Sequence, residues 1–116
     1  MEQKEESFKL RDEGAKHCYF VITPIDSDGN VVVVNCSSYR GTKQDDTTCI
    51  LNPGDHPFIT HTSYIAYRFA KMMKYSDVQK LNPVRDVSKE LYEKIREGAK
   101  NSDHTPIKIY QYMLNH

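Results

Sequence analysis

An aspartate and two histidines stand close together around a pair of prolines. Asp55 and His56 lie in the stretch Asn52–Pro57, and His61 follows shortly after. Proline fixes φ and has no N–H, so this stretch should be a stiff loop that holds Asp55 and His56 in one direction. A carboxylate beside an imidazole can bring the pKa of that imidazole near neutrality. The alternative is a corner whose polar side chains only satisfy local backbone groups.

These residue types suit acid–base chemistry without a metal. One histidine can take a proton, while a second histidine, an arginine or a lysine gives one or stabilises an anion. Such groups suffice to cleave RNA through its own 2′-hydroxyl. Two histidines and an aspartate could also hold a metal, but their spacing matches no closed zinc motif, so we expect no metal and no other cofactor. We predict catalytic roles for His56 as acid or base, for Asp55 in orienting it, and for His61.

Basic and aromatic residues are interleaved after His61. The basic residues are Arg68, Lys71 and Lys74, and the aromatic residues are Tyr64, Tyr67 and Phe69. A strand face that carries both types can hold a phosphate and stack a base. We therefore predict that Arg68 stabilises the charge of the transition state and that Tyr64 or Tyr67 stacks a base. An edge strand protected by its charges would explain the pattern equally well.

Polar residues also follow the most apolar run of the chain. Asn35, Ser37, Ser38 and Arg40 come directly after four valines. Sites are often built at strand ends and in the loops after them, although ordinary turn chemistry is the alternative. The predicted substrate-binding residues, in addition to the two tyrosines, are Ser38, Arg40, Ser63 and His104.

The composition favours one cytoplasmic domain. The chain has 116 residues with 16 basic and 16 acidic side chains, so its net charge of zero argues against a large non-specific grip on nucleic acid and leaves room for a small basic site. It has no apolar stretch long enough for a membrane span, and its charged N-terminus is unlike a signal peptide. The three cysteines have no Cys-x-x-Cys spacing, which favours buried, reduced thiols.

The order of the predicted elements is strands first and helices afterwards. Residues 1–16 should be a loose arm or a short, weakly docked helix, and residues 17–116 a single domain. Strands are expected at 18–22 and 31–34 around an Asp-Gly turn, and at 47–51. Residues 61–73 fit a helix or a strand, and their β-branched and aromatic content favours a strand.

Three helices should follow. Ser76 has the capping-box spacing for a short helix through Leu81, and residues 87–99 have one apolar face. Thr105 should cap a last helix that starts at Pro106 and buries Ile107, Tyr110 and Leu114. The predicted fold is α+β, mainly β: a small antiparallel barrel followed by short C-terminal helices.

Several motifs resemble those of small bacterial and phage-associated proteins that are similar to the PemK/MazF-like toxins of type II toxin–antitoxin pairs. They are Val-Asn-Cys-Ser-Ser at 34–38, Leu-Asn-Pro-Gly-Asp-His-Pro-Phe-Ile at 51–59, His-Thr-Ser-Tyr-Ile-Ala-Tyr-Arg at 61–68 and Ser-x-His-Thr-Pro at 102–106. The resemblance covers about residues 17–114. It implies an SH3-like barrel and a metal-independent, sequence-selective endoribonuclease. It further implies neutralisation by a cognate antitoxin protein and, often, a homodimer.

One departure from the family pattern bears on catalysis. These toxins usually carry a catalytic arginine in the loop after their first strands and a serine or threonine near the third. Arg40 and Thr47 or Thr48 are approximate counterparts here, and the loop lacks the usual Arg-Pro context. The loop of Asp55 and His56, with Arg68, could replace them. The alternative function is a non-enzymatic protein-binding module that uses this loop as its interaction surface.

Overall fold

The structure is a computed structural model, and it describes residues 6–9, 18–43, 45–55, 59–80 and 83–116. Its strands are β1 (Glu6–Lys9), β2 (Cys18–Val21), β3 (Asn30–Ser38), β4 (Ile50–Leu51), β5 (Ser63–Ile65), β6 (Lys71–Lys74) and β7 (Pro83–Asp86). Its helices are α1 (Tyr75–Gln79), α2 (Lys89–Asn101) and α3 (Ile107–Asn115), and a 3₁₀ turn, η1 (Tyr67–Phe69), lies between β5 and β6.

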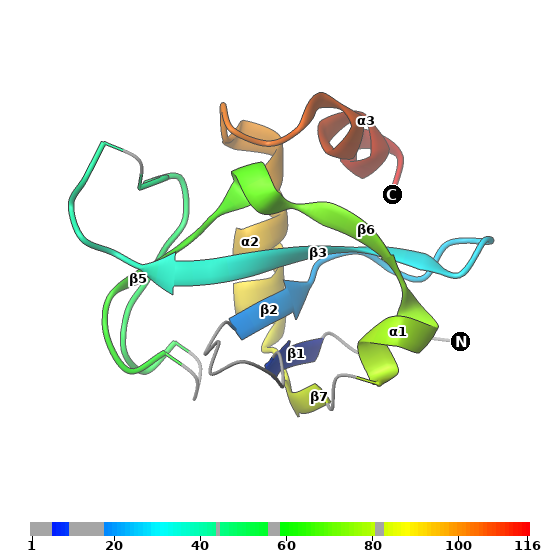
Figure 1. Cartoon of the computed structure of the whole chain (residues 1–116), viewed down its shortest axis with the longest axis horizontal. Helices are drawn as coiled ribbons and strands as arrows, with labels where there is room; N and C mark the ends of the chain where they lie inside the picture. The colour runs from blue at the N-terminus through cyan, green and yellow to red at the C-terminus, as the bar shows by residue number, and fades with distance from the viewer. Residues whose placement is uncertain (1–5, 10–17, 44, 56–58, 81–82) are drawn as a thin grey trace.

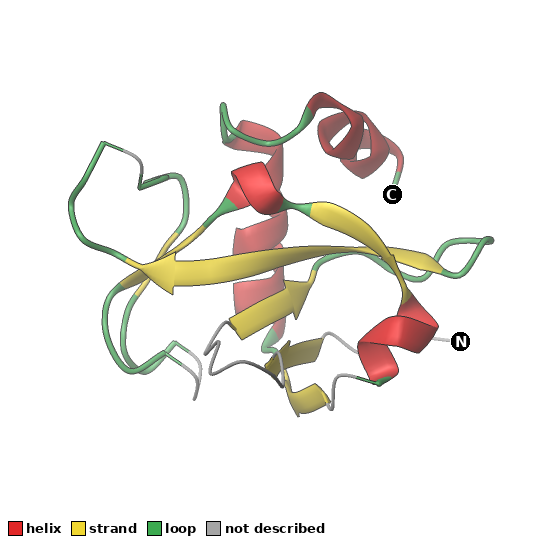
Figure 2. Cartoon of the chain, in the orientation of Figure 1, coloured by secondary structure: helices red, strands yellow, loops and turns green. Residues whose placement is uncertain are grey.

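The strands form one antiparallel sheet. Its order is β4-β5-β3-β2-β1-β7, and β6 pairs with β3 beside β5. Helix α2 crosses behind β3, α3 lies at one end of α2, and α1 follows β6 (Figures 1 and 2). The predicted α+β class is confirmed. Within the described residues, no ladder joins the end strands β4 and β7, so a closed barrel is not shown.

Strand β3 is buried on both faces, as its four consecutive valines predict. Val32 and Val34 belong to the larger core, which includes Leu91 and Ile95 of α2. Val31 and Val33 point the other way, into a smaller cluster with Val78 of α1. The predicted hairpin with β2 is confirmed, with Cys18 opposite Cys36 and Val21 opposite Val33. The helices on its two faces make this hairpin the centre of the domain.

The predicted strand at 61–73 is broken in its middle. Ile65 of β5 lies opposite Cys36 of β3, and Lys71 of β6 lies opposite Val33. Three steps along β3 are therefore matched by six steps along the other chain segment. The extra residues form η1, which bulges away from β3 between the two short strands. The strand prediction is confirmed for β5 and β6 and wrong for Tyr67–Phe69.

The break in the strand turns Tyr67 into the core. Its side chain is completely buried, and its hydroxyl donates a hydrogen bond of 2.7 Å to the carbonyl oxygen of Ile95. Gly98 lies one turn further along α2, and a Cβ atom at this position would overlap the Tyr67 hydroxyl and lie 2.7 Å from its Cζ. The absence of a side chain at Gly98 therefore makes room for the tyrosine.

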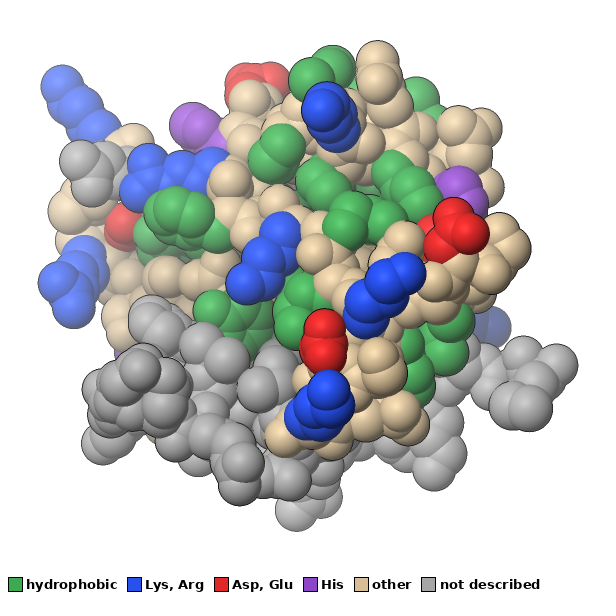
Figure 3. Space-filling view, turned by 45° about the vertical axis from the view of Figure 1, so that its right-hand side comes forward, with side chains coloured by type: hydrophobic (Ala, Val, Ile, Leu, Met, Phe, Trp, Pro, Cys, Tyr) green, Lys and Arg blue, Asp and Glu red, His purple; other side chains and the backbone are tan. Residues whose placement is uncertain are grey.

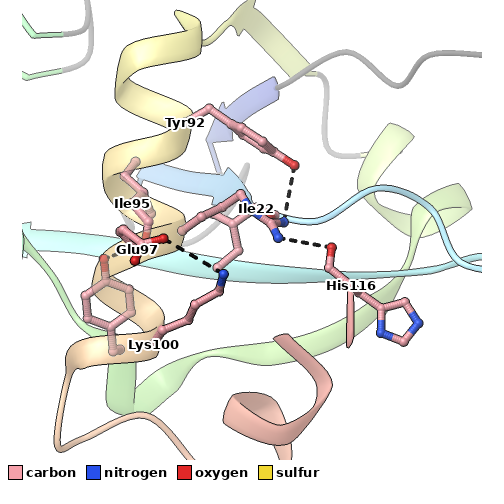
Figure 4. Close-up of polar contacts among 8 residues, drawn as sticks. Ile22, Tyr92, Ile95, Glu97, Lys100 and His116 are labelled. Carbon is pink, nitrogen blue, oxygen red and sulfur yellow. Dashed lines mark hydrogen bonds and ion pairs between the residues drawn. The ribbon is translucent and has the colours of Figure 1, made fainter. Parts of the chain in front are cut away.

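Arg96 joins α2 to two other parts of the domain. Its Nη1 donates to the carbonyl of Ile22 at 2.5 Å, and its Nη2 donates to His116 at 3.0 Å. Figure 4 shows these contacts together with Tyr92, whose hydroxyl accepts a hydrogen bond of 3.5 Å from Nη1. Helix α2 is thus held both to the end of β2 and to the end of α3.

The first part of the chain and the region from α1 to α2 differ from the prediction. Glu6–Lys9 pairs with β2 and β7, where a loose arm or a short helix was expected. Helix α1 begins at Tyr75 with Lys74 as its N-cap, so Ser76 is not the cap. Strand β7 was not predicted because it begins with a proline. It lies at the end of the sheet, where a missing N–H is tolerated.

The amphipathic helix over 87–99 is confirmed as α2, with Ser88 as its N-cap. The prediction for α3 is wrong in its cap and its buried face. Pro106 is the N-cap, and the buried residues are Ile109 and Met113, whereas Ile107 is 65% and Leu114 57% exposed. A helix face is set by the direction in which the preceding loop delivers the chain, and that direction is not encoded in the apolar spacing alone.

None of the helices in the described part of the chain has the length and apolar character needed to cross a membrane.

The contact between Tyr67 and Gly98 predicts an unusual response to Gly98→Ala. In an unhindered helix this change stabilises the fold by about 1 kcal/mol. Here the new methyl group displaces Tyr67, so we expect destabilisation of about 1–3 kcal/mol in urea denaturation. Glu97→Ala, at an exposed position of the same helix, is the control and should change stability by less than about 0.5 kcal/mol. A Gly98→Ala protein as stable as the wild type would contradict this packing.

Candidate functional site

The loop that was predicted to carry the acid–base pair is only partly described. His56 lies outside the described residues, so its role stays a prediction. Asp55 is exposed, and its Oδ2 accepts a hydrogen bond of 2.8 Å from the backbone N–H of Asn52. It also lines a hollow of about 180 Å³ with side chains of α2 and its cap, which are Ser88, Glu90, Leu91 and Lys94. The carboxylate thus stabilises its own turn.

The structure does not bring Arg68 to this loop. Arg68 is exposed on η1, with its guanidinium carbon 4.8 Å from the centre of the Phe69 ring. Figure 1 shows η1 at the top of the domain and the loop of Asp55 at the lower left. No hydrogen bond or ion pair in the described residues joins Asp55, His61 and Arg68. The predicted group of Asp55, His56 and Arg68 stays a prediction because His56 lies outside the described residues, and the break at η1 moves Arg68 out of line with β5.

A different pair of predicted residues does meet at the end of β3. The Oγ of Ser38 and the Nε2 of His61 are 2.6 Å apart, and the Nδ1 of His61 is 3.2 Å from the Oγ1 of Thr60. A backbone hydrogen bond of 3.0 Å from Tyr39 to Thr62 holds the two segments together. Both side chains of the pair are exposed, so a substrate can reach them.

Arg40 lies two residues beyond Ser38 in a braced loop. The Oδ2 of Asp45 accepts hydrogen bonds from the backbone N–H groups of Arg40 at 2.7 Å and Gly41 at 2.9 Å. These hydrogen bonds hold the pKa of Asp45 below its usual range, and the bond from Arg40 has the largest effect. Arg40 is exposed, and its backbone, held by Asp45, follows Ser38 by two residues.

A groove of about 410 Å³ lies between η1 and the sheet. It is lined by Tyr19, Asn35, Phe69 and Lys71. Tyr19 and Asn35 lie opposite each other on β2 and β3, and the Nζ of Lys71 is 5.9 Å from the centre of the Tyr19 ring. Phe69 is 57% exposed. The groove therefore combines the aromatic and basic side chains that were expected on a strand face.

The predicted stacking residues are not part of this groove. Tyr67 is completely buried and Tyr64 is 9% exposed, so neither ring is available to a base. Burial raises the pKa of Tyr67 well above its usual range. Ser63 is also buried, and its Oγ donates to the backbone carbonyl of His61 at 3.0 Å, so it positions His61 rather than a substrate. The burial of these side chains does not support the three predictions: every residue of β5 is buried, and Tyr67 of η1 turns into the core.

His104 belongs to a structural network before α3. Its backbone N–H donates to the Oγ of Ser102, and that hydroxyl donates to the Oδ2 of Asp46. Burial raises the pKa of Asp46, but the hydrogen bonds from Ser102 and Thr48 outweigh it, and the pKa is lowered. No contact in the described residues links His104 to Ser38 or His61, so its predicted role in substrate binding is not supported by its position.

Sequence reasoning missed Tyr19 and did not single out Asn35 and Phe69 as partners. The signal that could have revealed Tyr19 was the hairpin register, because a turn at Ser27–Asn30 places Tyr19 directly opposite Asn35. On the face shown in Figure 3, single Lys and Arg side chains lie among hydrophobic ones, which fits small basic sites rather than one broad basic surface.

Within the described residues, no three His, Cys, Asp or Glu side chains gather as metal ligands. Cys49 is buried, and burial raises the pKa of its thiol. Comparisons with known protein families, with curated protein sequences and with solved structures found no match to this chain.

The Asp46 network predicts a pH-dependent contribution to stability. A carboxyl group whose pKa is lower in the folded chain stabilises the fold above its ordinary pKa, 3.8 here, and this stabilisation is lost as the pH falls through the folded value. Asp46→Asn should therefore be less stable than the wild type at pH 7, by about 1–3 kcal/mol. In urea denaturation at pH 7, 5 and 3 the difference should narrow at pH 3. An equal difference at all three pH values would rule this explanation out.

Proposed function

We propose that the chain is a metal-independent endoribonuclease of the toxin–antitoxin type, with its reacting groups at the end of β3. The observation that carries the proposal is the exposed pair of Ser38 and His61, 2.6 Å apart, beside the braced loop of Arg40. The resemblance to PemK/MazF-like toxins adds the reaction type, and an SH3-like barrel is the finer fold that it implies.

Each residue of this site has a chemical role that its position supports. His61 takes the proton of an RNA 2′-hydroxyl, which binds where the Ser38 hydroxyl now contacts its ring. The 2′-oxygen attacks the adjacent phosphorus, the bond from phosphorus to the 5′-oxygen of the next nucleotide breaks, and that oxygen takes a proton from the predicted second acid, His56. Arg40 stabilises the charge on the phosphorus-centred intermediate. The products are a 2′,3′-cyclic phosphate and a 5′-hydroxyl.

The groove at Tyr19 and Phe69 supports the choice of RNA as the substrate. Exposed aromatic rings with neighbouring cations are the features that bind unpaired nucleotides. His56, which follows Asp55 in the sequence, keeps its predicted role as a second acid or base. A cognate antitoxin protein and a homodimer remain part of the proposal.

A second candidate is a non-enzymatic protein-binding module. The hollow between Asp55 and α2 favours it, because acidic, basic and apolar side chains line the same depression, as at many protein interfaces. This candidate predicts that the protein leaves RNA intact.

Incubation of the purified protein with single-stranded RNA in EDTA separates the two candidates. We expect cleavage to fragments with 2′,3′-cyclic phosphate ends, and a rate about 10²–10⁴-fold lower for His61→Ala. His116→Ala is the matched control, because this histidine stacks on Tyr112 at the end of α3, and it should cleave at the wild-type rate. Intact RNA with the wild type, or equal cleavage by His61→Ala, would contradict the assignment.

A further inference from the structure

Asn35 has a largely buried side chain that lines the groove between η1 and the sheet. The residue is 8% exposed, and its amide makes no hydrogen bond to any described residue, although its backbone carbonyl accepts one from Ala66 at 2.9 Å. Its neighbours on the same face of β3 are Val31 and Val33. Buried polar side chains almost always have a hydrogen-bond partner. The Asn35 amide keeps some access to solvent in the groove, so its donor and acceptor can receive a ligand there.

The groove gives this amide a defined surrounding. Asn35 is the most buried of its lining residues, and Tyr19, Phe69 and Lys71 complete the lining. Phe69 is held under the guanidinium of Arg68, and Lys71 lies over the ring of Tyr19. The volume of about 410 Å³ lies within the range of small-molecule sites. Aromatic lining with cations at its rim fits a flat ring that is attached to a phosphate.

We propose that the groove holds one unpaired adenine, read by the side-chain amide of Asn35. The amide presents an N–H donor and a carbonyl acceptor side by side, and adenine presents the complementary pair, its N7 acceptor and its N6 amino donor. Phe69 and Tyr19 supply the faces on which the base stacks, and Lys71 contacts a neighbouring phosphate. This inference rests on the proposed function in one respect, that the ligand is RNA, and it names the base that the chain selects.

Binding can be measured without cleavage. Fluorescein-labelled hexanucleotides of 2′-O-methyl RNA have no free 2′-hydroxyl to attack the phosphorus, so anisotropy reports binding alone. We expect the all-adenine oligonucleotide to bind about tenfold or more tightly than the all-uracil one. Asn35→Leu should remove this preference, and Phe69→Ala should weaken the binding of both. Asn115→Ala, at an exposed position of α3, is the control and should bind as the wild type does.

The stability of Asn35→Leu provides a second readout. Because the amide makes no hydrogen bond to a described residue, its replacement by an apolar side chain of similar size should leave the denaturation midpoint unchanged or raise it. Equal affinity of the wild type for both oligonucleotides, an adenine preference kept by Asn35→Leu, or a lower midpoint in Asn35→Leu would each overturn the proposal. Selective binding together with intact unmodified RNA would support the adenine site and contradict the ribonuclease. Cleavage without any base preference would support the ribonuclease and contradict the adenine site.

Discussion

The hydrogen bond from Tyr67 to the carbonyl of Ile95 is the contact on which the arrangement of the surface depends. Burial of a large aromatic ring contributes about 2–3 kcal/mol, which exceeds the net value of about 1 kcal/mol for the hydrogen bond. The hydrogen bond still decides the orientation, because a buried hydroxyl without a partner is costly. Only the space left by Gly98 lets the ring reach this carbonyl. A short stretch of α2 therefore dictates where a strand on the other side of the core must break.

The break has consequences at both ends of β3. On the N-terminal side of the break, β5 pairs with Cys36–Ser38 and brings His61 to Ser38. On the C-terminal side of the break, β6 pairs with Asn30–Val33 and carries Lys71 to the rim of the groove. At the break itself, η1 leaves Phe69 exposed beside Asn35. Had the strand continued without interruption, Phe69 would alternate with Arg68 along a flat surface, and no groove would form there.

Local patterns in the sequence were sufficient for the elements whose partners are near in the chain. The valines of β3, the Asp-Gly turn and the apolar face of α2 each specified their structure, because propensity and periodicity agreed there. Local patterns were insufficient where a residue far along the chain determines the structure. Tyr67 alternates like a strand residue, and its burial depends on Gly98, which lies in a helix far along the chain. The buried face of α3 likewise depends on the anchoring of the preceding loop to Asp46.

The candidate site shows the same division. Ser38, Arg40 and His61 were singled out by type and position, and the pairing of β3 with β5 brings Ser38 and His61 together. Arg68 was chosen for the same reasons and lies elsewhere, because the strand that was to align it is broken. Asn35 could not be recognised as unusual from sequence, since an asparagine at a strand end is common. Its significance comes from its place in the groove, where its amide makes no hydrogen bond to a described residue.

The most direct test of this account is a two-dimensional ¹H–¹⁵N spectrum of the side-chain amides during titration with a non-cleavable, adenine-containing RNA oligonucleotide. The account predicts that the Asn35 amide signals shift strongly at saturation, while the signals of the exposed Asn52 and Asn115 stay in place. Binding that leaves the Asn35 signals unchanged would show that the groove made by the broken strand is not where this protein holds a nucleotide.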